Sequence, residues 1–289
     1  RIYEDIACEE GCRITHIFET HRNEDYVIGS RDLSRRTGAE VFRGDRPDCT
    51  YGNKLEDGQQ FEFGDLVLTA LHTPGHTVAH MSYSLADKSF SDEALCVFTG
   101  DCLFIGDVGR TDFYPDKPKE MAAMQYESVH NKLLPLGDQT ILHPAHGAGS
   151  VCGISMASRE FSTLGYERRH NTKLQLGRDE FINAQVNEHH YRPPYFKRME
   201  QYNDEGPPVM DLLPRPMPCS ADEFAEVLNS GVQQLDIRSS EAFAGCHIGG
   251  SLNVPLDMIP AHAGWFLNYE EPIALIVENY EQICQAVRY

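Results

Sequence analysis

The stretch Thr73-Pro74-Gly75-His76-Thr77 decides the fold, because it places a histidine on a tight turn directly after the strand-like run of residues 65–72. The Pro-Gly pair rules out a helix here, so His76 and His72 cannot pair on a helix face. Polar, metal-competent side chains follow other strand-like runs in the same way, at residues 19–26, 99–101, 109–113 and 143–147. Because α/β proteins build their sites beyond the carboxyl ends of strands, we predict that these segments meet at one site.

The composition excludes several classes of partner. The chain has 25 Lys and Arg against 44 Asp and Glu, a formal charge of −19. Such an acidic surface repels phosphate backbones and anionic lipid, so we expect no nucleic acid and no membrane as partners. No apolar run approaches the roughly 18 residues of a membrane helix, and no targeting leader opens the chain. The nine cysteines lack CxxC spacing, which indicates reduced thiols. We therefore expect a soluble cytoplasmic protein.

The periodicity of the first two thirds of the chain indicates an α/β fold. Short β-branched or apolar runs bounded by turn residues predict strands at residues 14–19, 65–72, 81–85, 95–99 and 140–142. Helices are predicted at residues 26–37, 119–134, 178–189 and 195–202. Strands that alternate with helices in this way are typical of α/β proteins.

The 289 residues exceed the roughly 100–200 of one domain, so two domains are expected. We place the first at residues 1–205, a Pro-rich linker at 206–218 and the second domain at 219–289. In the second domain we predict a helix at residues 223–229, strands at 232–237 and 272–277, and a turn at 253–255. The first 11 residues resemble the tail of a helix and the last nine a helix cut short, so we expect a fragment of a longer protein.

The ordered polar segments resemble the metallo-β-lactamase superfamily from residue 14 to about residue 171. Its HxHxDH, TPGHT, GD and PxH segments occur here in the same order and at these spacings. The resemblance implies an αββα sandwich whose N-terminal part is missing from the chain. The first segment departs from the pattern, because Asn23 and Tyr26 replace its second and third histidines. Two-zinc hydrolases of the glyoxalase II type use all three, so the departure argues against a binuclear hydrolase.

One subgroup of the superfamily does not need those two positions. Persulfide dioxygenases hold a single Fe(II) with the three residues that correspond here to His21, His76 and Asp101. The resemblance thus implies one Fe(II) per chain, with two His and one carboxylate leaving three open positions. Residues 101–113 and 147–171 are also similar to segments of persulfide dioxygenases. The second of these segments resembles the bacterial proteins in which this domain is fused to rhodanese modules.

Three further residues are candidates for catalysis. We expect His146 to bond water or substrate near the iron. Arg110 either anchors the substrate or pairs with Asp112, and Cys152 either relays sulfur or is a buried cysteine. Asp25 is expected to orient the loop or a ligand histidine as a neighbouring carboxylate.

From about residue 217 the chain resembles a rhodanese domain. The residues that carry the resemblance are 236–238, 241–243 and 246–255, with Cys246 and Gly249 departing from the family pattern. Active rhodaneses place a nucleophilic cysteine directly after the strand that corresponds to residues 272–277, and here that residue is Glu278. A carboxylate cannot carry a persulfide, and Cys284 lies six residues later. We expect an inactive, truncated rhodanese-like domain with a structural or docking role.

Together these features predict a persulfide dioxygenase of sulfide detoxification. It would oxidise a low-molecular-weight persulfide of glutathione, coenzyme A or cysteine with O₂ to sulfite and thiol. Two alternatives stay open: a glyoxalase II-like or other thioester hydrolase with zinc in the mononuclear site, and a non-catalytic scaffold. The thiol carrier, the bound metal and a homo-oligomeric state also stay open.

Overall fold

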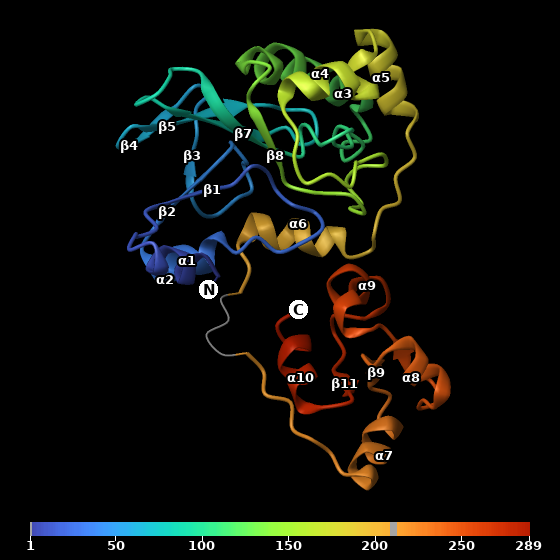
Figure 1. Ribbon diagram of the computed structural model, residues 1–289. Coiled ribbons are helices and arrows are strands. Elements are labelled where there is room, and N and C mark those ends of the chain that lie inside the picture. Colours follow the sequence, from blue (N-terminus) through green and yellow to red (C-terminus); the bar gives the residue numbers. More distant parts are fainter. Residues whose placement is uncertain (1, 209–212) are drawn as a thin grey trace. The chain divides into compact units, whose positions relative to one another are not determined.

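The computed structural model describes residues 2–208 and 213–289 (Figure 1). It divides into two compact units, which are described separately. The first comprises the residues up to Tyr191 together with Arg198–Pro208, and the second comprises Arg192–Lys197 and the remaining residues to Tyr289. Part of the predicted linker, residues 209–212, lies outside the described residues.

The first unit contains two sheets. The larger has the order β4-β5-β6-β7-β8, antiparallel except for β8, which runs parallel to β7. Its strands are β4 (Gln60–Phe63), β5 (Leu66–His72), β6 (Met81–Asp87), β7 (Ala94–Gly100) and β8 (Ile141–Pro144). The smaller is a parallel sheet of β1 (His16–Phe18), β2 (Glu40–Arg43) and β3 (Asn53–Lys54). The predicted strands are present, while β2, β3 and β4 are additional to the prediction.

Helices cover the outer sides of the two sheets (Figure 1). The helices of this unit are α1 (Ile2–Glu9), α2 (Ser30–Thr37), α3 (Pro118–Ser128), α4 (Leu164–His170), α5 (Arg178–Asn187) and α6 (Phe196–Glu205). One apolar core joins the large sheet to the helical layer and contains Val97, Leu103, Val129, Leu133, Leu142, Leu164 and Phe181. A second core joins the two sheets and contains Phe42, Leu55, Leu68, Ala70, Met81 and Tyr83. This layering confirms the predicted α/β class.

The helix predicted over residues 26–37 is wrong at its start, because α2 begins only at Ser30. The preceding backbone is held by a tertiary contact instead. Asn203 of α6 accepts a hydrogen bond from the Ile28 N–H (2.8 Å) and donates one to the Tyr26 carbonyl (2.8 Å). The helix predicted over residues 119–134 leaves α geometry after Ser128 and continues as a wider turn, Val129–Leu133.

The second unit has a three-stranded parallel sheet of order β10-β9-β11. Its strands are β9 (Gln233–Asp236), β10 (Leu252–Asn253) and β11 (Ile273–Ile276), and its helices are α7 (Ala221–Asn229), α8 (Ser240–Gly245), α9 (Ile259–Phe266) and α10 (Tyr280–Ala286). Ser220 and Glu223 cap α7 reciprocally, as their spacing predicts. A small core of Leu235, Ile237, Val254 and Ile259 holds the unit together.

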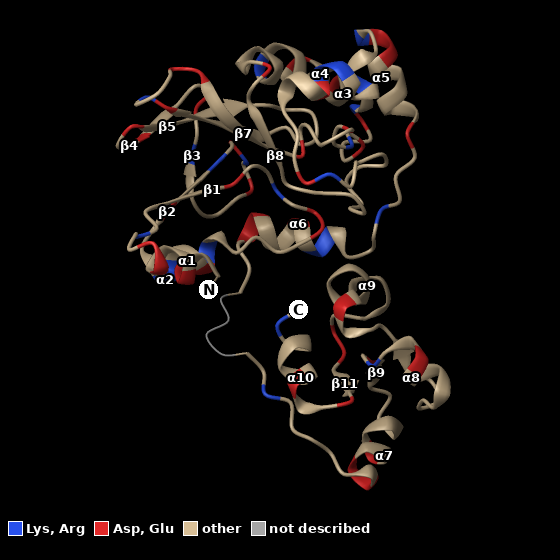
Figure 2. Ribbon diagram, in the orientation of Figure 1, with Lys and Arg blue, Asp and Glu red and all other residues tan. Residues whose placement is uncertain are grey.

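Acidic residues are spread over both units (Figure 2). Among the described helices, none combines the length and the apolar character that a membrane crossing requires.

Candidate metal centre

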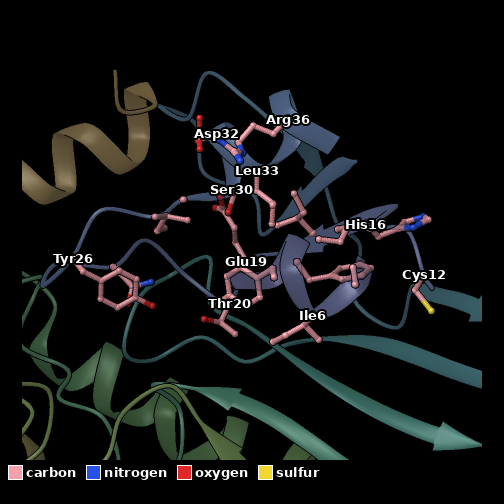
Figure 3. Close-up of a pocket in the computed structure, with 18 of the residues that line it drawn as sticks. Ile6, Cys12, His16, Glu19, Thr20, Tyr26, Ser30, Asp32, Leu33 and Arg36 are labelled. Atoms are coloured by element: carbon pink, nitrogen blue, oxygen red, sulfur yellow. The ribbon is translucent and has the colours of Figure 1, made fainter. Parts of the chain in front are cut away.

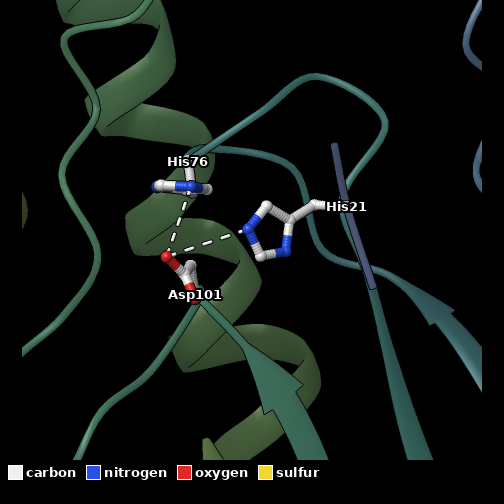
Figure 4. A group of neighbouring side chains, drawn as sticks. All are labelled: His21, His76 and Asp101. Atoms are coloured by element: carbon white, nitrogen blue, oxygen red, sulfur yellow. Dashed lines mark ion pairs between the residues drawn. The ribbon is translucent and has the colours of Figure 1, made fainter. Parts of the chain in front are cut away.

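Three of the predicted site residues meet at one buried point. His21 follows β1, His76 lies on the turn between β5 and β6, and Asp101 follows β7 (Figure 4). Their ligand atoms all lie within 4.8 Å of one another. Asp101 Oδ2 is 3.5 Å from His76 Nε2 and 3.8 Å from His21 Nε2. The strand ends that the sequence singled out therefore converge as expected.

Each of these side chains points one polar atom at the common point, and a contact of its second polar atom fixes its orientation. His21 Nδ1 lies 2.9 Å from Thr20 Oγ1, His76 Nδ1 lies 2.9 Å from the Arg110 carbonyl oxygen, and Asp101 Oδ1 lies 2.8 Å from His146 Nδ1. Because a carbonyl oxygen only accepts hydrogen bonds, His76 Nδ1 carries a proton, and Nε2 is the ring nitrogen that faces Asp101. This arrangement is typical of metal-ligating histidines, which donate their second ring N–H to a fixed acceptor.

The atoms that face the common point lack hydrogen-bond partners. They are His21 Nε2, His76 Nε2 and Asp101 Oδ2, all buried. A buried polar atom left unsatisfied costs about 1–3 kcal/mol, so three of them around one point call for a compensating charge. Two atoms bound tetrahedrally at about 2.1 Å from one metal lie about 3.4 Å apart, close to the separations seen here. The donor set thus fits a single divalent metal.

The electrostatics of the site suit a metal as well. Burial lowers the pKa of His21 well below its ordinary value and keeps its imidazole neutral, the form that binds metals. Burial alone would raise the pKa of Asp101, but the neighbouring histidines His21, His76 and His146 outweigh it and hold that pKa well below its usual range. The site therefore presents an ionised carboxylate and a neutral histidine.

His146 lies between two carboxylates. Its Nδ1 is 2.8 Å from Asp101 Oδ1 and its Nε2 is 2.9 Å from Asp25 Oδ2. Burial would lower the pKa of His146, but the two carboxylates raise it to about 10. The predicted hydrogen bond from His146 to water or substrate is therefore not what this structure shows, since both ring nitrogens have protein partners. Asp25, which we expected to orient the loop or a ligand histidine, contacts His146, which is not one of the three ligands.

Cys152 is buried close to these residues. Asp25, His146 and Cys152 form a second group whose ligand atoms lie within 4.8 Å of one another. Burial and the nearby carboxylates raise the pKa of the Cys152 thiol well above its ordinary value. Sulfur transfer requires a thiolate, so this environment favours the alternative of a buried, protonated cysteine.

Arg110 is fully buried and is paired with Asp112 through two hydrogen bonds, each of 2.6 Å. Its Nη1 also donates to the carbonyls of Val151 (3.3 Å) and Tyr191 (3.0 Å). The structure therefore favours the ion-pair alternative over the substrate anchor. Arg110 also positions His76, because its backbone carbonyl accepts a hydrogen bond from His76 Nδ1.

Sequence reasoning missed His80, which lies four residues after His76. The His80 ring stacks on His21 with centroids 5.1 Å apart, and its Nε2 accepts the Asp101 N–H at 3.0 Å. Burial lowers its pKa to about 3, so His80 is a neutral residue that positions two of the ligands. Gly100 leaves it room, because a Cβ at Gly100 would lie 2.6 Å from His80 Nε2.

Glu24 was also missed. Its side chain is completely buried, and its Oε2 lies 3.6 Å from His76 Nε2. In the sequence it is one acidic residue among several polar neighbours, and no spacing singles it out. Asn203 was missed for a different reason, since it holds the Asn23 carbonyl (2.7 Å) from 180 residues away.

A cavity of about 800 Å³ lies beside the centre (Figure 3). It is bounded by α1, α2 and β1, and apolar side chains such as Phe18, Ile28 and Leu33 make up much of its wall. His21, Asn23 and Tyr26 also line it, so the cavity extends to the loop that carries the first ligand.

Known proteins resemble this chain over part of its length. A model described as the metallo-beta-lactamase superfamily matches residues 9–146. The mitochondrial persulfide dioxygenase ETHE1 of Bos taurus is 31% identical over 178 residues, which cover 61% of this chain and 63% of that protein. The match thus spans less than two thirds of that relative. Hydroxyacylglutathione hydrolases match at 29–30% identity over 46–49% of this chain.

Two solved structures extend the comparison. A metallo-beta-lactamase from Staphylococcus aureus subsp. aureus COL aligns with a TM-score of 0.85 and 29% identity, covering 99% of this chain and 83% of that one. ETHE1 from Myxococcus xanthus aligns with a TM-score of 0.59 and 29% identity, covering 70% of this chain and 81% of that one. Residues 9–146 therefore match the metallo-beta-lactamase superfamily model, and the chain is similar to persulfide dioxygenases at about 31% identity.

Proposed function

We propose that this chain is a mononuclear non-haem Fe(II) persulfide dioxygenase. The observation that carries the proposal is the set of unbonded atoms of His21, His76 and Asp101 around one buried point, while Asn23 and Tyr26 replace the other histidines of the motif. Two His and one carboxylate form the facial triad of non-haem Fe(II) oxygenases. The ETHE1 relatives support the same reaction.

The proposed reaction is R–S–SH + O₂ + H₂O → R–SH + SO₃²⁻ + 2 H⁺. Bound Fe(II) would supply the electron-transfer chemistry with O₂ and persulfide sulfur. The protein supplies orientation, because Arg110 and His80 fix the ligands and His146 donates to Asp101. Burial of the three ligands keeps bulk water from the centre. The thiol carrier, a role in sulfide detoxification and a cytoplasmic location stay predictions.

A thioester hydrolase with zinc is the second candidate. The hydroxyacylglutathione hydrolase relatives favour it, as does the group of Asp25, His146 and Cys152, which could hold a further metal. A metal-bound hydroxide would then attack a carbonyl carbon. A non-catalytic scaffold is disfavoured, because it gives no reason for three buried, unbonded ligand atoms around one point.

The deciding experiment measures metal content and two reactions on one preparation. We expect protein purified without oxygen to hold one iron per chain and to consume O₂ and release sulfite with glutathione persulfide or coenzyme A persulfide. Hydrolysis of S-lactoylglutathione is measured in parallel. Two equivalents of zinc together with thioester hydrolysis would decide for the second candidate.

We further propose that the second unit is an inactive rhodanese-like module. Glu278 follows β11, and the Glu278 N–H donates to Gln282 Oε1 (2.8 Å). The full chain is therefore expected to transfer no sulfur from thiosulfate to cyanide above the uncatalysed rate, as measured by thiocyanate formation. Turnover that disappears in Cys284→Ser would mean that the active-site loop lies elsewhere.

A further inference from the structure

We propose that Glu24 is a fourth protein ligand of the metal. The inference rests on the metal-binding part of the proposed function and not on dioxygenase chemistry. Glu24 lies between the first ligand, His21, and the neighbouring carboxylate Asp25, and its side chain is directed at the centre.

The side chain of Glu24 is fully shielded from solvent, and neither carboxylate oxygen has a hydrogen-bond partner. Oε1 lies 3.6 Å from Arg22 Nη2, and Oε2 lies 3.6 Å from His76 Nε2. A buried carboxylate without hydrogen bonds is costly, and proteins compensate such a charge by pairing it or by binding a metal. Arg22 lies near one oxygen, and the other oxygen faces His76 Nε2, where a bound metal would also compensate its charge.

His76 shows where that cation sits. Its Nδ1–H is committed to the Arg110 carbonyl, so Nε2 is the nitrogen that faces Asp101 Oδ2 at 3.5 Å and Glu24 Oε2 at 3.6 Å. These separations exceed the 2.7–3.2 Å of a protein hydrogen bond. They are a little longer than the roughly 3.0 Å (six-coordinate) to 3.4 Å (tetrahedral) between two atoms bound at about 2.1 Å to one metal, and the contact to Glu24 is shorter than the one from His21 to Asp101 (3.8 Å).

Glu24 lies outside the group whose ligand atoms all fall within 4.8 Å of one another. Its carboxylate would have to move to join the shell, and its oxygens make no hydrogen bond that such a movement would break. A fourth ligand fills one of the three positions that a facial triad leaves open. In a six-coordinate site, two positions then remain for persulfide sulfur and O₂.

The test is a Co(II) titration of the metal-free full chain, followed by visible absorption and repeated for Glu24→Gln. This substitution keeps the size of the side chain and removes its charge. The matched control is Glu200→Gln, because Glu200 Oε1 also lies 3.6 Å from Arg22 Nη2, while Glu200 belongs to neither group of possible metal ligands among the described residues. We expect Glu24→Gln to weaken Co(II) binding by at least about 100-fold, since loss of an outer-shell partner alone costs 10–100-fold. Glu200→Gln should bind Co(II) like the wild type.

The melting temperatures of the same proteins separate a ligand from a structural carboxylate. Without metal, Glu24→Gln should melt no lower than the wild type, because it removes a buried charge that lacks a hydrogen bond. With Co(II), the wild type should gain more than the variant. Equal Co(II) affinity of wild type and Glu24→Gln overturns the inference, and so does a similar loss in Glu200→Gln. If the wild type itself binds neither Co(II) nor Fe(II), the proposed function fails together with it.

Discussion

Replacing His21 or His76 by alanine is expected to remove the metal and to abolish persulfide-dependent oxygen uptake. Each residue comes from a separate strand end and supplies an unbonded nitrogen to the common point, so neither has a substitute. Iron should fall from one equivalent per chain to background. The measurements are elemental analysis of protein purified without oxygen, and oxygen consumption with sulfite detection using glutathione persulfide.

Asn23→Ala is the matched control, because Asn23 is buried in the same loop as His21 and is not one of the proposed ligands. Its carbonyl is held by Asn203, an interaction that alanine preserves. We expect the variant to keep its iron and to lose only a modest part of the oxygen uptake. If Asn23→Ala strips the metal as thoroughly as His21→Ala, or if the iron-loaded wild type consumes no oxygen, the dioxygenase proposal fails.

The parts of the fold that the sequence predicts are those in which local pattern and burial agree. The β5 strand, Leu66–His72, ends at a Pro-Gly turn and buries Val67, Leu68 and Ala70, so its boundaries follow from local signals. The β4 strand, Gln60–Phe63, alternates polar and apolar residues over only four positions and is largely exposed, and this short pattern was not recognised as a strand. The α4 helix, Leu164–His170, is likewise too short to show a clear helical period in the sequence, and it was not predicted.

Some residues of the metal centre could be predicted from the sequence, and others only from the folded structure. The strand ends predict that the segments of His21, His76 and Asp101 meet, and the resemblance to persulfide dioxygenases is what singles out these three residues as ligands. Glu24 and His80 lie within the same segments, but their roles depend on which neighbours the fold brings to them. Asn203 could not be predicted, because its partner Asn23 lies 180 residues earlier and only the folded chain joins them.

Asp112→Ala is expected to destabilise the first unit by about 1–3 kcal/mol, the cost of leaving a buried polar group without its partner, because Arg110 is fully buried although the Asp112 side chain is 38% exposed. The Arg110 guanidinium is fully buried and makes two 2.6 Å hydrogen bonds to Asp112, so the substitution leaves a buried charge without its anionic partner. The carbonyls of Val151 and Tyr191 continue to accept from it, which keeps the cost from being larger.

Urea unfolding of the metal-free full chain measures this effect and separates the two units. The single tryptophan, Trp265, lies in the second unit, so its fluorescence follows that unit while far-ultraviolet circular dichroism follows both. Asp112→Ala should shift only the unfolding transition of the first unit, which circular dichroism detects and tryptophan fluorescence does not. Asp116→Ala is an exposed acidic control in the same segment, and its free energy of unfolding should stay within about 0.5 kcal/mol of the wild type. If Asp112→Ala leaves stability unchanged but raises KM for the persulfide, Arg110 anchors the substrate and the ion-pair interpretation is wrong.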